Sequence, residues 1–380
     1  MAKHAFGTKF RKNIEKFNSP TIHQGFEQNP QWCGIGNYAM NKLLSGSYFH
    51  AFMYGRSVLI GGESGSGKSL ILATAAAEAQ KSNDTHIIWV DVENATTESW
   101  LNALGVDTAP DKFSPMNAST MGDVKRIIAD VVKVSDAEPE NDKTNLMIVI
   151  DSWSDLLTEK ELDEATSGKM VGDQGQAAKQ TKNIIKAAGH MVVRRPIIVA
   201  GVVHTMESQN KYDPDEKFLG GRGLVYLASI AFLFQKYKLK GEDVNEFDAS
   251  SKQVDKKVVG TKCKVKLYKS RFTKPNEEVE VQLVYPHGLD PFSGLFNYMR
   301  EDELIVTAKG LGRYMVKWPE GAVVPPEVPE SFTKKQFKGN IALRIMQAVD
   351  ISPHVVEFTD EELSEDDNEL IEDDEDDDNV

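Results

Sequence analysis

The stretch that decides the fold is residues 62–69, which read Gly-Glu-Ser-Gly-Ser-Gly-Lys-Ser and match the pattern G-x4-G-K-[ST]. It follows the aliphatic run 57–60 and opens a helical pattern at 68–81. In such a loop, glycines let backbone N–H groups approach phosphate oxygens, and the helix N-terminus adds the positive end of its dipole. We therefore predict a nucleoside triphosphate site in which Lys68 contacts the β- and γ-phosphates and Ser69 contacts Mg²⁺. The residues of this site are Gly62, Glu63, Ser64, Gly65, Ser66, Gly67, Lys68 and Ser69.

Outward from this motif, aliphatic runs alternate with helical patterns. The runs are 57–60, 86–90, 146–150, 196–203 and 230–234, and the helical patterns between them are 68–81, 97–104, 121–134 and 176–193. Strands that are apolar on both faces and alternate with helices indicate a mostly parallel sheet covered by helices on both faces. The stretches 262–268 and 277–285 have a different period, which predicts an antiparallel extension of the sheet. The fold class is therefore α/β.

The chain divides into four parts. We expect an N-terminal leader at 1–34, which either packs on its own domain or serves as a polymerisation element, and a core at 35–293. A small C-terminal domain should follow at 294–358, with helices near 295–302 and 333–347. Residues 359–380 should form a disordered tail, because residues 360–378 contain fourteen Asp or Glu and no Lys or Arg. These carboxylates account for the whole formal charge of −14, so the rest of the chain is neutral.

Composition excludes several classes of protein. Of the 380 residues, 40% are hydrophobic and 27% are charged, which excludes full-length disorder, collagen-like structure and a disulfide scaffold. Cys33 and Cys263 are far apart, and the first residues contain no apolar stretch of the signal-peptide type. We therefore expect a cytoplasmic protein. The longest purely aliphatic run is much shorter than the roughly 20 residues that span a bilayer, so we expect no membrane segment.

Two carboxylates follow strands of the predicted sheet. Asp151 ends the run 146–150 at the carboxyl edge, where open α/β sheets bind ligands, and is the natural carboxylate on the Mg²⁺ side. The alternative is a plain turn residue. Glu93, in Trp89-Val-Asp91-Val-Glu93, stands at the tip of the neighbouring strand and could orient an attacking water. Taken alone, Glu93 is equally well explained as a solvated loop residue.

Over roughly residues 35–320 the sequence resembles the RecA-type recombinases, particularly the UvsX-like recombinases of T-even-type bacteriophages. The motifs occur in the family's order: 36–46 with Gly55-Arg56, Asp91-Val-Glu93 with 104–107, Gly220-Gly221 with Ala228-Ser229, Lys269-Ser-Arg271, and 287–294. The resemblance implies a RecA-like P-loop NTPase core that uses ATP and Mg²⁺.

The resemblance also assigns roles around the nucleotide. It implies that Glu93 is the catalytic glutamate, that Trp100 lies against the adenine, and that Lys269 and Arg271 reach the ATP of the neighbouring subunit. His204 fits the role of γ-phosphate sensor, although Val203 precedes it where the family usually has Asn. The alternative for His204 is a structural residue at a strand end.

Two loops correspond to the family's DNA-binding loops. The loop 205–223 has a net charge of −1, so its aromatic residues are better suited than its charge to hold DNA, by stacking on bases. A flexible lid is the alternative. The shorter loop 159–176, which includes Lys160, resembles the first DNA loop. The expected DNA contacts are Lys169, Met170, Lys211, Tyr212, Lys217, Phe218, Gly220, Gly221 and Arg222.

The predicted function is therefore that of an ATP-dependent DNA recombinase, a DNA-dependent ATPase. It would form helical filaments on single-stranded DNA and exchange that strand with double-stranded DNA, with loading or single-strand-binding proteins as partners. The acidic tail would either be a solvated appendage or compete with DNA for basic surface. Two alternatives share the fold: a ring-forming helicase-type motor and a non-polymerising ATP-binding regulator.

Overall fold

The computed structural model describes residues 12, 30–168, 176–206, 217–219, 225–236, 260–284 and 288–350. Most of the predicted leader and the acidic tail lie outside these residues. Among the described residues, no helix combines the length and the apolar character that a membrane crossing requires. The division into four parts stays a prediction.

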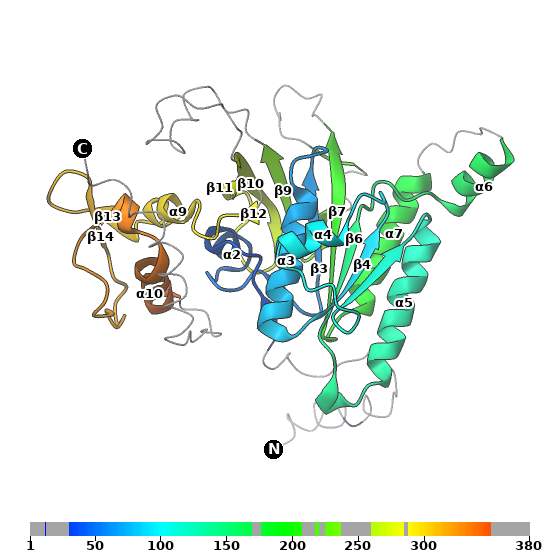
Figure 1. The fold of residues 1–380 in the computed structure, drawn as a ribbon, viewed down its shortest axis with the longest axis horizontal. Coiled ribbons are helices and arrows are strands. Elements are labelled where there is room, and N and C mark those ends of the chain that lie inside the picture. Colours follow the sequence, from blue (N-terminus) through cyan, green and yellow to red (C-terminus); the bar gives the residue numbers. More distant parts are fainter. Residues whose placement is uncertain are drawn as a thin grey trace, which may run out of the picture. The chain divides into compact units, whose positions relative to one another are not determined.

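A ten-stranded sheet organises the core (Figure 1). Its order is β12-β11-β10-β9-β3-β7-β6-β4-β5, and β8 pairs with β7. The strands from β9 to β5 run parallel, whereas β10, β11 and β12 are antiparallel. The bounds are β3 (Ser57–Gly62), β4 (His86–Asp91), β5 (Phe113–Asn117), β6 (Leu146–Asp151), β7 (Ile197–Met206), β8 (Lys217–Phe218), β9 (Ile230–Lys236), β10 (Gly260–Ser270), β11 (Glu278–Val284) and β12 (Gly288–Leu289). The predicted α/β class and the antiparallel extension are confirmed.

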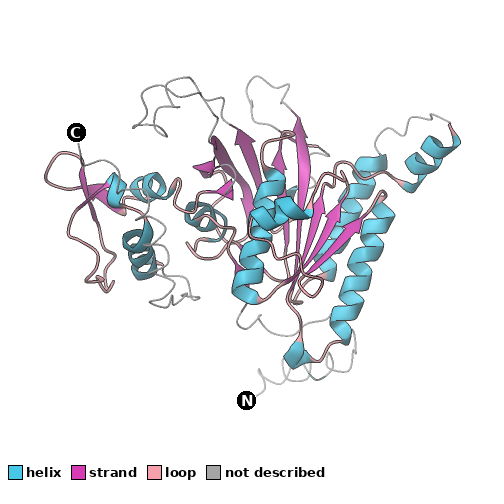
Figure 2. Ribbon diagram, in the orientation of Figure 1, coloured by secondary structure: helices cyan, strands magenta, loops and turns pink. Residues whose placement is uncertain are grey.

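Helices cover both faces of this sheet (Figures 1 and 2). Successive residues of a strand point to opposite faces, so Ile87 and Trp89 join one hydrophobic cluster while Ile88 and Val90 join the other. Buried side chains from α2 (Tyr38–Ser45), α3 (Lys68–Asn83) and α4 (Glu98–Ala103) complete the first cluster. Side chains from α5 (Met121–Ala137) and α7 (Gln176–Met191) complete the second. This two-sided burial explains why the strands are continuously apolar.

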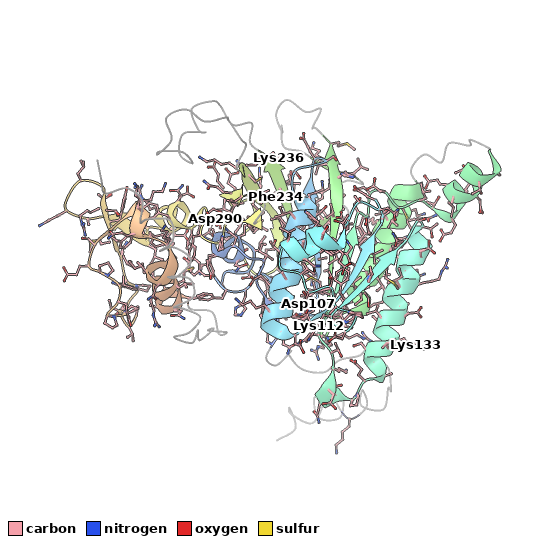
Figure 3. All side chains as sticks on the ribbon, viewed as in Figure 1. Asp107, Lys112, Lys133, Phe234, Lys236 and Asp290 are labelled. Atoms are coloured by element: carbon pink, nitrogen blue, oxygen red, sulfur yellow. The ribbon has the colours of Figure 1, made fainter. Side chains whose placement is uncertain are left out.

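Individual side chains illustrate the layering (Figure 3). Phe234 on β9 is fully buried in the first cluster. Lys133 on α5 is exposed and points away from the sheet. The helix α5 therefore has one apolar face on the core and one charged face in water.

The strand β5 and the segment 159–176 differ from the sequence-based expectation. The strand β5 was not predicted, because its residues Phe-Ser-Pro-Met-Asn include a proline and only two strongly apolar side chains. The segment expected to be a loop at 159–176 instead begins with α6 (Glu159–Ser167). Thr158 and Glu161 form a reciprocal capping box at its start, and Gly168 ends it in a left-handed conformation. A polar sequence thus forms a helix because both of its ends are capped.

The C-terminal part is small and mixed. It contains α9 (Leu295–Glu301), an antiparallel sheet of β13 (Ile305–Thr307), β14 (Arg313–Val316) and β15 (Phe332–Thr333), and α10 (Gly339–Val349). The helix expected at 333–347 begins later, because β15 and a short 3₁₀ turn take up residues 332–336. Buried Asp350 at the end of α10 accepts hydrogen bonds from the Ser47 hydroxyl (2.7 Å) and the Tyr48 N–H (2.9 Å).

A close approach between β7 and the turn after β6 fixes the middle of the sheet. A Cβ atom at Gly201 would lie 2.1 Å from the indole nitrogen of Trp153, which is itself buried. The indole therefore occupies the space that any other residue at position 201 would fill. The backbone N–H of Trp153 also donates to the Val202 carbonyl (2.9 Å).

Substitution of Gly201 by Ala should therefore destabilise the protein by about 1–3 kcal/mol, because a buried indole has no room to move. Gly122→Ala is the matched control. Its Cβ would meet the exposed carboxylate of Glu159, which can rotate away, and would lie at an ordinary contact distance of 3.6 Å from Arg126 Nη2, so stability should stay the same or rise slightly. Urea unfolding of both variants measures the difference, and equal midpoints would contradict the packing described for Trp153.

Candidate functional site

The carboxyl ends of four parallel strands meet at one edge of the sheet. Gly62, the last residue of β3, lies opposite His204 of β7, and Asp91 of β4 lies opposite Asp151 of β6. The Val92 N–H donates to the Asp151 carbonyl (2.8 Å), which joins the segments that follow β4 and β6. Residues that immediately follow these strands therefore converge on one place.

The loop 63–67 leaves this edge and turns into α3. Lys68, the first residue of α3, is almost fully buried. Its Nζ atom donates hydrogen bonds to the carbonyls of Gly62 (2.9 Å) and Glu63 (2.6 Å). A Cβ atom at Gly62 would lie 2.4 Å from the Phe234 carbonyl oxygen, so only glycine fits there. Gly67 has a φ of 105°, in the left-handed region that favours glycine. Gly62 and Gly67 thus hold positions in the loop that a residue with a side chain would disrupt.

One buried hydroxyl in this loop indicates that the loop binds a phosphate group. Ser66 is 2% exposed, and its hydroxyl has no hydrogen-bond partner in the described structure. A buried donor without an acceptor is unfavourable, and a phosphate oxygen would satisfy it. The loop around it, Glu63 to Gly65, is open to solvent. These residues therefore fit the phosphates of a nucleotide.

Asp151 and Ser69 lie beside this loop. The Ser69 hydroxyl hydrogen-bonds the Asp151 carboxylate, and Asp151 is buried. Burial raises the pKa of Asp151, the Ser69 hydrogen bond lowers it, and the neighbouring Asp91 carboxylate raises it further. A buried carboxylate next to a hydroxyl is a ligand set of the kind that Mg²⁺ prefers. Both predicted metal ligands therefore fit the ion.

Three side chains stand together beyond Asp151. His204 Nε2 lies 3.2 Å from Asp155 Oδ2 and 3.6 Å from Glu93 Oε1. Their ligand-capable atoms all lie within 4.8 Å of one another. Partial burial is the main cause that raises the pKa of Glu93, and the negative charges of Asp151 and Asp155 raise it further. Glu93 thus has the position and the environment of a carboxylate that can take a proton.

Asp155 was missed by the sequence reasoning. It follows β6 by four residues, in the stretch Asp-Ser-Trp-Ser-Asp. The signal that could have identified it is a second acidic residue shortly after the strand end that carries Asp151.

Trp100 lies on α4, the short helix after the Glu93 loop. Its backbone N–H donates to the Thr97 hydroxyl that caps the helix (3.3 Å). Its ring is partly buried against the cluster on the α3 face. The adenine contact expected of Trp100 stays a prediction.

Lys269 and Arg271 lie at the opposite end of the strands. The Arg271 N–H donates to the Ser229 carbonyl (3.1 Å), and the Ser229 N–H donates to the carbonyl of Ser57, the first residue of β3. Since the phosphate loop begins after the last residue of β3, Arg271 and the phosphate loop are about 17 Å apart along the strand direction. Lys269 Nζ donates to the carbonyls of Tyr226 (2.5 Å) and Ala228 (2.6 Å). Burial lowers the pKa of Lys269, and Arg271 lowers it further.

Most of the expected DNA contacts lie outside the described residues. They are Lys169, Met170, Lys211, Tyr212, Gly220, Gly221 and Arg222. Lys217 and Phe218 form β8. This strand pairs with Met206 and Thr205, the last two residues of β7, which follow His204. Phe218 is buried. Its ring packs edge-on against the Tyr268 ring, with the two ring centroids 5.7 Å apart, and a Cβ atom at Gly61 would lie 2.5 Å from the Phe218 ring. Contrary to our expectation, the Phe218 ring is a core residue here and is not presented to bases.

Most of this chain is similar in sequence to known proteins. The RecA N-terminal domain family matches residues 27–290. A "Recombination and repair protein" of Enterobacteria phage T4 is 24% identical over 270 residues, which cover 71% of this chain and 63% of the phage protein, less than two thirds of its length. A "Protein RecA" of Limosilactobacillus reuteri is 24% identical over 297 residues (78% of this chain, 74% of that protein). A "Protein RecA" of Corynebacterium urealyticum is 25% identical over 347 residues (90% and 85%).

Proposed function

This chain belongs to the RecA N-terminal domain family, and from that premise we propose that it is an ATP-dependent recombinase that assembles on single-stranded DNA. The observation that carries the proposal is the convergence of Lys68, Ser69, Asp151, Glu93 and His204 at one edge of the sheet. Lys68 and Ser69 were predicted from the phosphate-loop motif, Asp151 and Glu93 from their places at strand ends, and His204 from the family resemblance. Their meeting place has residue types that would bind ATP and Mg²⁺ and orient an attacking water.

The phosphate loop would bind the nucleotide. The Ser66 hydroxyl and the loop N–H groups donate to phosphate oxygens, and the Lys68 ammonium exchanges the Gly62 and Glu63 carbonyls for the β- and γ-phosphates. Ser69 and Asp151 would hold Mg²⁺, which neutralises charge on the phosphates when it is bound. Trp100 would contact the adenine. These residues bind and orient the substrate before any bond changes.

Hydrolysis would then depend on Glu93. Its carboxylate accepts a proton from a water molecule as the water oxygen bonds to the γ-phosphorus. The bond from that phosphorus to the bridging oxygen breaks, and ADP and inorganic phosphate leave. His204 stands next to Glu93 and at the start of the segment that leads to β8, so it can relay γ-phosphate occupancy to that segment.

The positive charges that complete the site would come from a neighbouring subunit. Lys269 and Arg271 lie far from the phosphate loop of their own chain, at the other end of the strands. A head-to-tail arrangement in which they face the next subunit's ATP gives a heterologous interface, and such an interface continues into a filament if it does not close into a ring. Hydrolysis would then depend on assembly, and assembly on DNA.

Substitution of Glu93 by Gln keeps the size of the side chain and removes its basicity. Nucleotide binding should change by no more than about twofold, while hydrolysis stimulated by single-stranded DNA should fall by about 10²-fold or more. Since the pKa of Glu93 is raised, the wild-type rate should begin to fall, as the pH is lowered, at a higher pH than an ordinary carboxyl would give.

Steady-state hydrolysis across a pH series measures both effects. Glu98→Gln, which removes an exposed carboxylate from the first turn of α4, is the control and should hydrolyse ATP normally. Near-normal turnover of Glu93→Gln would remove Glu93 from the mechanism.

Substitution of Arg271 by Ala should leave ATP binding intact and abolish DNA-dependent hydrolysis, because the lost charge belongs to the neighbour's site. Arg271 is exposed and is a cleaner target than Lys269, whose ammonium also holds backbone carbonyls of its own chain. In filaments that mix the Arg271→Ala and Glu93→Gln proteins, some interfaces should pair the native Glu93 of one subunit with the native Arg271 of the next. Activity should therefore partly return. If labelled variants co-assemble and no activity returns, the two residues do not share a site across the interface.

A further inference from the structure

We propose that Asp155 is a positioning residue that holds His204 and thereby leaves Glu93 free to accept the proton of the attacking water. The inference rests on the proposed function, because it concerns the same site. It assigns a role to a residue that neither the motifs nor the resemblance singled out.

The turn that carries Asp155 is fixed against β7 by two hydrogen bonds. The Trp153 N–H donates to the Val202 carbonyl (2.9 Å), and the His204 N–H donates to the Ser154 hydroxyl oxygen (2.8 Å). Packing of the Trp153 indole over Gly201 adds a third constraint. These three contacts place the turn so that Asp155 stands opposite His204.

The Asp155 carboxylate is itself oriented. Its Oδ2 atom accepts a hydrogen bond from the Ser152 hydroxyl, and Ser152 is fully buried. The same oxygen lies 3.2 Å from His204 Nε2. An acceptor that a buried hydroxyl fixes on one side presents a defined position to the imidazole on the other.

Asp155 and Glu93 are alternative acceptors for one imidazole nitrogen. A single N–H at Nε2 makes one good hydrogen bond, and Asp155 at 3.2 Å is nearer than Glu93 at 3.6 Å. Val203 offers no polar alternative, since it is buried in the second hydrophobic cluster. While Asp155 accepts from His204, Glu93 keeps its oxygens for water.

Removing Asp155 should therefore affect the rate of the chemical step and not the affinity for nucleotide. In Asp155→Ala the imidazole can turn to Glu93 and occupy the base, so kcat for DNA-dependent hydrolysis should fall by about tenfold to a hundredfold, with KM for ATP within about twofold. Asp155→Asn keeps an acceptor oxygen at the same place, and its kcat should stay within about threefold of wild type.

The decisive experiment combines these variants with His204→Ala in a double-mutant cycle, measured under single-turnover conditions so that slow rates are accessible. If Asp155 acts through His204, Asp155→Ala should change the rate by less than about twofold when His204 is already absent, at a pH high enough that Glu93 is ionised with or without the Asp155 charge. Asp130→Asn, an exposed carboxylate on α5, is the control for charge and should match wild type. Equal losses in Ala and Asn, or a full Asp155 effect without His204, would overturn the proposal.

A readout without catalysis separates this inference from the proposed function. In the nucleotide-free protein, the ring ¹⁵N signals of His204, assigned by comparison with His204→Ala, should shift in Asp155→Ala and stay near the wild-type values in Asp155→Asn. An unshifted His204 signal in Asp155→Ala would overturn the Asp155 assignment. If wild-type protein hydrolyses no ATP with single-stranded DNA, the proposed function fails, and the ring signals still decide the Asp155 contact.

Discussion

Parallel pairing in register is the constraint on which the rest of the structure depends. Because β3 pairs with β7 and β4 pairs with β6 so that Gly62 faces His204 and Asp91 faces Asp151, and because Ile150 of β6 faces Gly201 of β7, the carboxyl ends of the four strands lie within about two residues of one level. A shift of one residue in either pair would turn buried side chains to the opposite face of the sheet, so the two hydrophobic clusters hold the register. The site is thus assembled by core packing, and its polar side chains only have to stand at the strand ends.

The same register separates the two halves of the proposed catalytic apparatus. The phosphate loop, Asp151 and Glu93 stand at the carboxyl end of the strands, and Arg271 stands level with the first residue of β3. No side chain bridges a separation of about 17 Å along a strand. A second subunit is the simplest source of the missing charge, which distinguishes an assembling ATPase from a regulator that works alone. A ring-forming motor would use the same pair of surfaces, so the difference between the two lies in whether the interface closes.

Sequence patterns predicted what depends on local chemistry. Gly62, Lys68 and Ser69 follow from one motif, and the buried strands follow from continuous apolar runs, because each pattern has few structural solutions. Asp155 was not predicted, since its position opposite His204 depends on the turn after β6, in which Trp153 packs over Gly201 of β7. The burial of Phe218 was missed for the same reason, because it arises from contacts with Gly61 and Tyr268, which are distant in sequence. Non-local contacts of this kind leave no periodic signal.

We propose that successive subunits share each ATP site in an open helical assembly on DNA. Negative-stain electron microscopy of the full-length protein with single-stranded DNA and a non-hydrolysable ATP analogue is the test of this proposal. We expect continuous helical filaments whose length follows that of the DNA, and no filaments when the analogue is omitted. Discrete rings or dispersed monomers under the same conditions would contradict it.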